Sequence, residues 1–263
     1  MNPLTEFRSG TAVHFAALAV CALLILTLGV TGRRSDSARR SGALRQSIGY
    51  GCLVVWLLNT ASWLTPARFS WDRSLPLQVC NLANIFGALA VLRQQRLSQG
   101  VIYFWGLGLC IWAFLTPTLD VGPARFGFWI FWTYHLFIGL ALVYVLTFDR
   151  FRPQATDLLS SLFVTYAYVA IVAAIDLAFG WNYGFVGPGR PTAPTPVDVL
   201  GPYPLRILWM TLAGSAVFVL LWLPWRDRRG GGTPKSVPAQ RSNRSRNSAG
   251  KSGQDSGTRP NSA

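Results

Sequence analysis

The chain has 263 residues, of which 51% are hydrophobic and only 13% are charged. Soluble domains average about 25% charged residues, so this composition excludes an ordinary water-soluble protein. The formal net charge of +14 would suit nucleic acid, but half of it lies from Arg226 onward and the remainder lies between apolar segments. Membrane topology accounts for such a distribution, so no nucleic-acid partner is expected.

Seven apolar segments follow one another along the chain. Most approach the length of about twenty residues that crosses a hydrocarbon core about 30 Å thick. The pattern predicts an all-α, polytopic integral membrane protein with a seven-transmembrane-helix bundle. The expected spans are residues 11–30, 48–64, 75–92, 98–115, 126–148, 157–179 and 203–223.

The basic residues predict an orientation for these spans. The first, third and fifth loops and the carboxyl-terminal segment hold eighteen Lys and Arg residues, against six elsewhere. By the positive-inside rule, the short segment 1–10 should lie outside and the carboxyl terminus in the cytoplasm, in a multi-pass protein of the cell membrane. Residues 226–263 are rich in Gly, Ser, Arg and Lys, and are expected to form a disordered basic tail.

The third span carries several polar residues. Pro76 suits the first helical position, which would place Cys80 about one helical turn further in. Asn84 follows Cys80 on the same helix face, with Gln78 and Asn81 beside it. Polar groups within a span are costly unless they find partners, so they indicate a bundle interior or a functional site. Hydrogen bonding between helices is the simpler interpretation of the amides.

The fifth span holds His135 near its middle. The predicted orientation brings the third and fifth helices in from the outer side, so Cys80 and His135 would lie at depths of roughly 7 and 13 Å. Helix tilt and side-chain reach could close such a gap. An imidazole that accepts the thiol proton would form the nucleophile–base pair of covalent catalysis. The alternative is a histidine that is hydrogen-bonded within the bundle.

Other residues near the predicted outer end could complete a site. Asp120 or Asp176 could orient the imidazole, as the acid of a catalytic triad does, or could be an interface residue. Asn182 and Tyr183 begin the last outer loop and could line a lipid-headgroup pocket, although turn formation alone would also explain them. Arg190, in the same loop, could meet a phosphate.

The sequence gives little support for metal, nucleotide or redox-cofactor chemistry. Its two histidines, His14 and His135, are far apart and no acidic cluster accompanies them, so neither a metal site nor a cofactor is expected. The glycine-rich nucleotide-binding motifs do not occur. The four cysteines lie in apolar segments without a CxxC pair, which argues against a disulfide framework. Two matching halves, the usual sign of a transporter, are not recognisable.

Six features occur in order along the chain: Leu75–Cys80 (LPLQVC), Tyr103–Gly106 (YFWG), Leu115–Pro117 (LTP), His135 in an aromatic span, Asn182-Tyr183, and Leu200–Pro204 (LGPYP). Together they resemble the YwaF-like bacterial integral membrane proteins, which are similar to the eukaryotic transmembrane-protein-164 family. The resemblance covers roughly residues 49–225.

The resemblance implies a seven-helix fold. For the eukaryotic branch it implies an acyltransferase that moves fatty acyl chains between phospholipids through a cysteine thioester with a histidine partner. These two roles carry over to Cys80 and His135. The sequence departs from the family pattern at Thr118, where an aspartate is common, and at Asp176, where a neutral amide is expected. Both departures leave the third catalytic residue open.

The leading hypothesis is therefore a lipid acyltransferase, or a lipid hydrolase, with its site in the outer half of the membrane. Its partners would be a phospholipid acyl donor and a lysolipid acceptor; the sequence leaves the oligomeric state open. Gln78, Asn81 or Asn84 could donate to the oxyanion of the reaction. The alternative is a non-catalytic seven-helix membrane protein, such as a receptor, a lipid-binding scaffold or a transporter.

Overall fold

A computed structural model describes residues 4–34, 42–189 and 196–226, and it confirms the all-α prediction for this part of the chain. The described residues all belong to one compact unit. The predicted basic tail lies outside the described residues beyond Arg226. Within the described ranges, strand-like pairing is confined to an isolated bridge between Glu6 and Val121.

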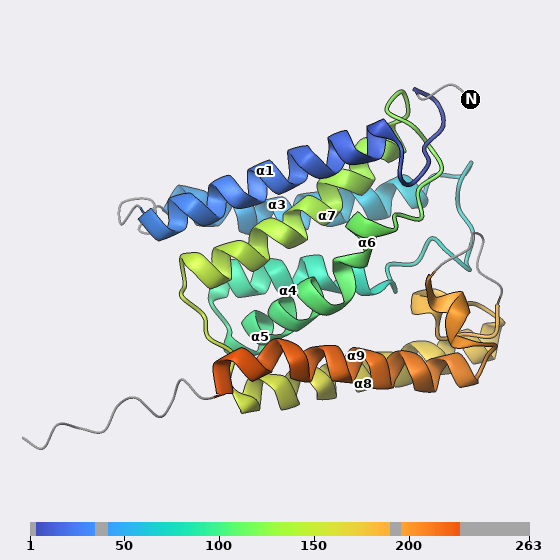
Figure 1. Cartoon of the computed structure of the whole chain (residues 1–263). Coiled ribbons are helices and arrows are strands. Elements are labelled where there is room, and N and C mark those ends of the chain that lie inside the picture. Colours follow the sequence, from blue (N-terminus) through green and yellow to red (C-terminus); the bar gives the residue numbers. More distant parts are fainter. Residues whose placement is uncertain (1–3, 35–41, 190–195, 227–263) are drawn as a thin grey trace, which may run out of the picture. The chain divides into compact units, whose positions relative to one another are not determined.

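Long helices account for most of the described residues (Figure 1). They are α1 (Ala12–Arg34), α3 (Gly42–Trp63), α4 (Val79–Arg93), α5 (Arg96–Trp105), α7 (Phe126–Thr147), α8 (Ala155–Phe179) and α9 (Leu205–Arg226). Helix α5 continues through a π-helical turn, η1 (Gly106–Cys110), into the short α6 (Trp112–Leu115). Two 3₁₀ turns, η2 (Tyr183–Phe185) and η3 (Pro196–Leu200), lie between α8 and α9.

Five of these helical stretches are long and apolar enough to cross a membrane: α1, residues 96–115, α7, α8 and α9. Helix α4 is apolar but has only 15 residues. Helix α3 is not among the five, and its first turns carry the polar residues Arg45 and Gln46. The helices indicate a multi-pass membrane protein.

The side chains that face outward support the same conclusion. Large apolar residues are widely exposed on the outer helices, for example Leu23 of α1 at 65% and Phe163 of α8 at 74%. Exposed apolar surface of this extent is rare on soluble monomers. In a bilayer the same surface meets hydrocarbon, while helices satisfy their own backbone groups.

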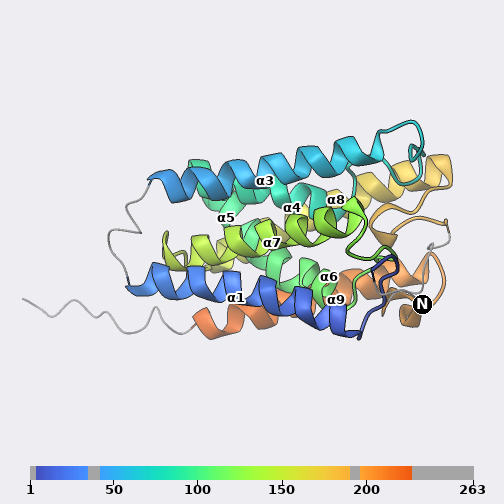
Figure 2. The ribbon, with the colours of Figure 1, turned by 90° about the horizontal axis from the view of Figure 1, so that it is seen from above.

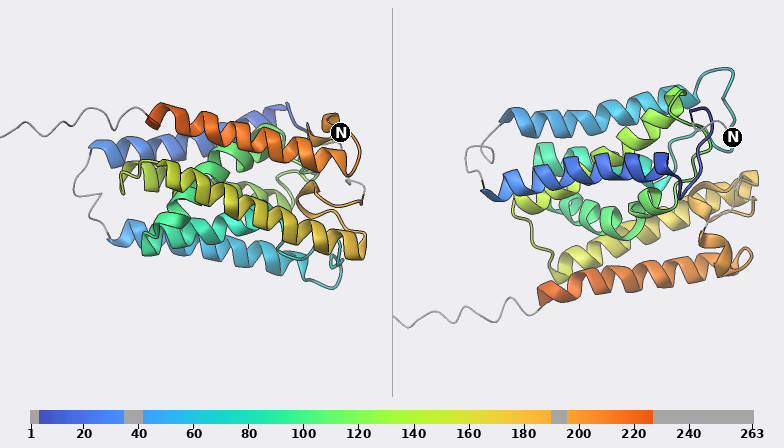
Figure 3. Two further views of the ribbon diagram at one scale, coloured as in Figure 1. Left: turned by 90° about the horizontal axis from the view of Figure 1, so that it is seen from below. Right: turned by 45° about the horizontal axis from the view of Figure 1, so that its top comes forward.

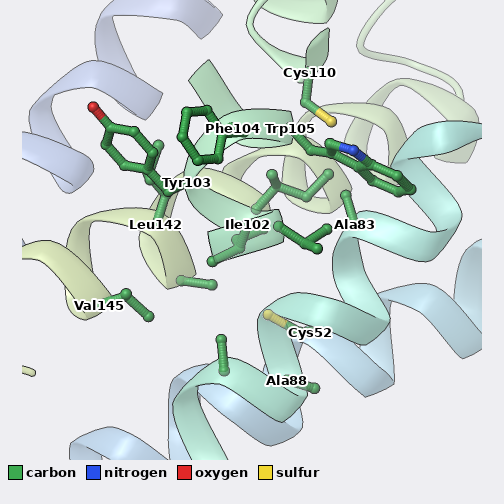
Figure 4. Packing of buried hydrophobic residues seen from close by; sticks show 14 of the residues in the cluster. Cys52, Ala83, Ala88, Ile102, Tyr103, Phe104, Trp105, Cys110, Leu142 and Val145 are labelled. Atoms are coloured by element: carbon green, nitrogen blue, oxygen red, sulfur yellow. The ribbon is translucent and has the colours of Figure 1, made fainter. Parts of the chain in front are cut away.

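The helices pack in a simple order. Helices α1 and α3 both contact α7 and lie on either side of it (Figure 2). Helix α4 contacts α3, α5 and α7, and α5 in turn contacts α8. Helix α9 lies beside α8 and also meets η1 (Figure 3). Helices α4 and α5 are therefore covered by protein, as the buried residues Ala83, Ile102 and Trp105 show (Figure 4).

The prediction that the helix of the third span begins at Pro76 is wrong. Helix α4 begins at Val79, so Pro76 lies before the helix and Cys80 stands in its first turn. The preceding segment stays non-helical because other parts of the chain take its backbone groups. Leu75 N–H donates to the Tyr183 hydroxyl (2.9 Å), and Leu77 O accepts from the Tyr168 hydroxyl (2.8 Å).

A network of ion pairs joins the helices at the end of the bundle where α4 and α7 finish. Asp149, just after α7, pairs with Arg45 at 3.2 Å and accepts from Gln94 at 2.7 Å. Asp157 pairs with Arg96 at 2.6 Å and also caps the start of α8. We call this set the basic-end network.

Candidate thiol–imidazole site

Three side chains from different helices meet in what we call the thiol cluster: Cys80 of α4, Cys110 of η1 and His135 of α7. The Cys80 thiol donates to Cys110 Sγ, and the two sulfurs are 3.7 Å apart. His135 lies close enough to the Cys80 thiol for the two side chains to interact electrostatically. The structure thus brings together the two residues to which the resemblance assigns catalysis, and it adds a second thiol.

The position of Cys80 is set by contacts just before α4. The Tyr183 hydroxyl accepts from Leu75 N–H and donates to Trp71 O at 2.7 Å, and burial raises the pKa of Tyr183 so that the hydroxyl keeps its proton. Gln78 Oε1 accepts from Gly184 N–H at 3.0 Å. These bonds fix the non-helical segment before α4 and also Gln78, the residue before its first turn. The backbone position of Cys80 is therefore fixed as well.

One glycine makes this arrangement possible. Gly184 has a φ of +59°, and a Cβ there would lie 2.5 Å from the Tyr168 hydroxyl oxygen. A residue with a side chain would therefore be strained and would push against Tyr168. That tyrosine also donates to Leu77 O, so η2 and the approach to α4 depend on the same close contact.

Cys110 owes its direction to the π-helical turn. An extra residue in a helical turn shifts the phase of the residues after it, and such turns are frequent at functional sites. Gly108 lets η1 approach α9, where a Cβ would lie 2.9 Å from the Phe218 ring. Cys110 is buried at the edge of the same core as Trp105 (Figure 4). Residue type and span alone did not indicate Cys110 as a site residue; the glycines of Gly106-Leu107-Gly108 were the signal for an irregular turn.

His135 is held in one tautomer. Its Nδ1 lies 2.8 Å from Phe131 O, and since a carbonyl can only accept, Nδ1 carries the hydrogen. Neutral imidazole then leaves a lone pair on Nε2, which suits a proton acceptor. The ring is buried and lies 4.4 Å from the Phe131 ring, centre to centre. The orienting role expected of an aspartate is here filled by a backbone carbonyl.

The two aspartates lie elsewhere. Asp120 is exposed in the loop before α7, where its carbonyl accepts from Phe7 N–H at 2.9 Å. Asp176 is fully buried near the end of α8, and a Cβ on Gly187 would touch it. Within the described part of the chain, neither carboxylate is hydrogen-bonded to His135.

The three amide side chains near Cys80 differ in which of their N–H donors remain unused. Asn84 Nδ2 donates to Cys80 O (3.2 Å) and to Tyr134 O (3.3 Å), so it braces α4 against α7. Asn81 Oδ1 accepts from the Tyr134 hydroxyl at 2.6 Å, which leaves its Nδ2 donors without an acceptor among the described residues. Gln78 likewise uses only Oε1.

The predicted headgroup residues take part in the loop between α8 and α9. Asn182 Oδ1 accepts from Gly187 N–H (3.0 Å) and from Arg206 (2.9 Å). Arg206, which the sequence analysis missed, is buried and also donates to Phe185 O at 3.0 Å. These bonds give Asn182 and Tyr183 a structural role, and headgroup contact stays a prediction. Arg190 lies outside the described residues.

The apolar helices, and the thiol cluster that joins α4, η1 and α7, define a multi-pass membrane protein with a polar site inside its helix bundle. The model of the TMEM164 family matches residues 9–222, so the chain belongs to the TMEM164 family. Neither a curated protein nor a solved structure matches the chain.

Proposed function

We propose that this protein is a lipid acyltransferase, or a lipid hydrolase when water replaces the acceptor, and that it belongs to the YwaF-like bacterial branch of the family. The observation that carries the proposal is the proximity of Cys80 and His135, with Nδ1 of the imidazole bound to a carbonyl and Nε2 left to accept a proton. A thiol and a base in contact form the activated nucleophile of covalent catalysis.

In the first half-reaction, His135 Nε2 takes the proton from Cys80 Sγ. The thiolate attacks the ester carbonyl carbon of a phospholipid, which forms an S–C bond and places negative charge on the carbonyl oxygen. Collapse of this intermediate breaks the ester C–O bond. The departing alkoxide takes the proton from the His135 imidazolium and leaves as a lysolipid, and the acyl group stays on Cys80 as a thioester.

In the second half-reaction, an acceptor hydroxyl gives its proton to His135 Nε2 and its oxygen attacks the thioester carbonyl. The C–S bond breaks, and Cys80 recovers the proton from the imidazolium. A lysolipid acceptor gives a new phospholipid, whereas water gives a free fatty acid. The proposed reaction balances in atoms and charge without a cofactor, because each proton that His135 accepts is returned within the same half-reaction.

The start of α4 supports the charged steps. Cys80 stands in the first turn, where unpaired N–H groups and the helix dipole favour an anion. The spare Nδ2 donors of Asn81 are the best placed of the three amides to bind the oxyanion, because those of Asn84 are already used. Such a donor is worth about 3 kcal/mol in other enzymes.

We further propose the orientation expected from the loop charges, with the amino terminus outside and the carboxyl terminus in the cytoplasm of the cell membrane. The basic-end network would then face the cytoplasm, and the thiol cluster, near the starts of α4 and α7, would lie in the outer half of the membrane. The substrate would enter from the outer leaflet.

Acyl exchange in reconstituted vesicles tests the proposal. The vesicles would contain a phospholipid with a labelled acyl chain and an unlabelled lysolipid, and mass spectrometry would follow the label. The wild type should transfer it, and Cys80→Ala and His135→Ala should each reduce transfer to the level of empty vesicles. Cys52→Ala is the matched control, because Cys52 is a buried thiol that donates to Phe137 O at 3.6 Å.

Retention of transfer by Cys80→Ala would rule out the thioester mechanism. Absence of both transfer and free fatty acid with the wild type would instead favour a receptor, scaffold or transporter. Insertion of each variant into the vesicles must match the wild type before the rates are compared.

A further inference from the structure

We propose that Cys110 is a positioning residue for this reaction: its S–H donates a hydrogen bond to the Cys80 thiolate and holds the sulfur in the attacking position. The inference rests on the proposed function, because it concerns the charged form of Cys80. It assigns a role to the one member of the thiol cluster that the acyl-transfer steps do not use.

The geometry of the two thiols supports this role. In the neutral state Cys80 donates to Cys110 across 3.7 Å between the sulfurs. Once the Cys80 proton has passed to His135, Cys80 has no hydrogen left to donate, whereas Cys110 keeps its own. Rotation about the Cβ–Sγ bond of Cys110 turns this hydrogen toward the thiolate without moving either helix. Hydrogen bonds to an ionised acceptor are about twice as strong as neutral ones.

Two of the neighbouring side-chain donors are engaged elsewhere, and the spare Nδ2 group of Asn81 is assigned to the oxyanion in the proposed mechanism. Asn84 Nδ2 is bound to two backbone carbonyls, and the Tyr134 hydroxyl donates to Asn81. The thiolate would therefore have two partners in the thiol cluster, the imidazolium of His135 and the Cys110 thiol from η1. Contacts from two different helical segments, α7 and η1, would hold the sulfur in place for attack on the substrate carbonyl.

The π-helical turn gives this contact a structural origin. Cys110 is the last residue of η1, and the two glycines of that turn pack against α7 and α9. Each residue of a regular helix turns by about 100°, so the wider turn changes the direction in which Cys110 points. The irregular helix therefore brings a second thiol to Cys80.

The test compares Cys110→Ala, which lacks a donor, with Cys110→Ser, which keeps a hydroxyl donor. The full-length protein in nanodiscs would be labelled with an alkyne-tagged long-chain iodoacetamide from pH 5 to pH 10. Peptide mass spectrometry would quantify the label on Cys80. Cys52→Ala again controls for the loss of a buried thiol, and the thermal unfolding midpoint shows that each variant is folded.

For Cys110→Ala we expect the pH of half-maximal labelling to rise by about one unit and the rate at neutral pH to fall about tenfold. Cys110→Ser should stay within about threefold of the wild type. The donor role is overturned if Cys110→Ala labels like the wild type, or if the serine variant falls as far as the alanine variant, since packing would then be the cause. Wild-type Cys80 that resists labelling throughout this range would overturn the proposed function itself.

Discussion

The two histidines of this protein lie in similar surroundings but have different partners. His14 of α1 and His135 of α7 are both buried among aromatic rings, and each binds a backbone carbonyl. His14 Nε2 donates to Phe114 O at 2.8 Å, while its Nδ1 accepts from Gly10 N–H at 2.9 Å. Both of its nitrogens are used by the backbone, so His14 can only tie the amino terminus to α6.

His135 differs in one nitrogen. Its Nδ1 binds Phe131 O, but the ring also lies near the Cys80 thiol, a group that can give up its proton. Burial and aromatic contact therefore do not separate the structural His14 from His135, for which we propose a catalytic role. The chemical nature of the second partner does. Substitutions of His14 and of His135 should therefore have different effects.

The largest effect is expected for His135→Ala. Loss of a general base typically lowers a rate by a factor of about 10² to 10⁴. We expect the rate of Cys80 labelling by an acyl-like electrophile at neutral pH to fall within this range, while the protein stays folded. Labelling kinetics with peptide mass spectrometry provide the measurement. A rate within about threefold of the wild type would show that His135, like His14, has only a structural role.

Asn81→Ala should follow in size. The Nδ2 donors of Asn81 have no acceptor among the described residues, so they are free to bind the oxyanion. Loss of an oxyanion donor costs a factor of about 10² in rate. The matched control is Tyr134→Phe, which removes the bond to Asn81 Oδ1 but leaves the Nδ2 donors. Acyl-exchange rates should fall much further for the first variant than for the second. Equal losses would show that Asn81 only supports Tyr134.

His14→Phe should affect stability instead of rate. An aromatic ring is kept, but Phe114 O loses a buried hydrogen-bond partner, and an unsatisfied buried group costs about 1–3 kcal/mol. The thermal unfolding midpoint in detergent should fall, with labelling of Cys80 per folded molecule unchanged. A selective loss of labelling at unchanged stability would mean that His14 takes part in the site.

The smallest effect concerns the basic-end network. Burial raises the pKa of Asp149, which lies after α7 outside the membrane-spanning segments. A raised pKa means that the folded state holds the proton more tightly, so this contribution to stability is fully present below the ordinary carboxyl pKa of 3.8 and is lost as pH rises through the raised value.

Asp149→Asn should remove this dependence. At pH 7 its stability should lie within about 1 kcal/mol of the wild type, because the lost pair with the partly exposed Arg45 is offset by the removed burial cost. Unfolding midpoints measured from pH 4 to pH 7 should change less with pH in the variant. An equal slope in both proteins would assign the titration to another group.

The sequence predicted much of the fold because long apolar segments have few alternatives in a bilayer. The helices α7 and α8 begin within two residues of the expected spans. It misplaced the start of α4 because Pro76 is compatible with a helix start, and hydrogen bonds from the distant Tyr168 and Tyr183 decide otherwise. Local preference cannot reveal a partner about a hundred residues away.

The site was predictable only in part. Cys80 and His135 were recognisable from residue type, span and family resemblance. Cys110 was not, because its direction depends on the π-helical turn η1. Arg206 was also missed, since a basic residue near a span boundary suggests topology and not a buried bond to Asn182. Both depend on tertiary packing that a single sequence does not encode locally.

The most direct test of the central claim is the mass of the acyl-enzyme. The purified protein would be incubated with a phospholipid of defined acyl chains, quenched with acid and digested. The peptide that contains Cys80 should carry the mass of one acyl chain, neutral hydroxylamine should remove it, and His135→Ala should lack it. An unmodified Cys80 peptide, or an acyl chain on Cys52 or Cys21 instead, would contradict the pairing of Cys80 with His135 as nucleophile and base.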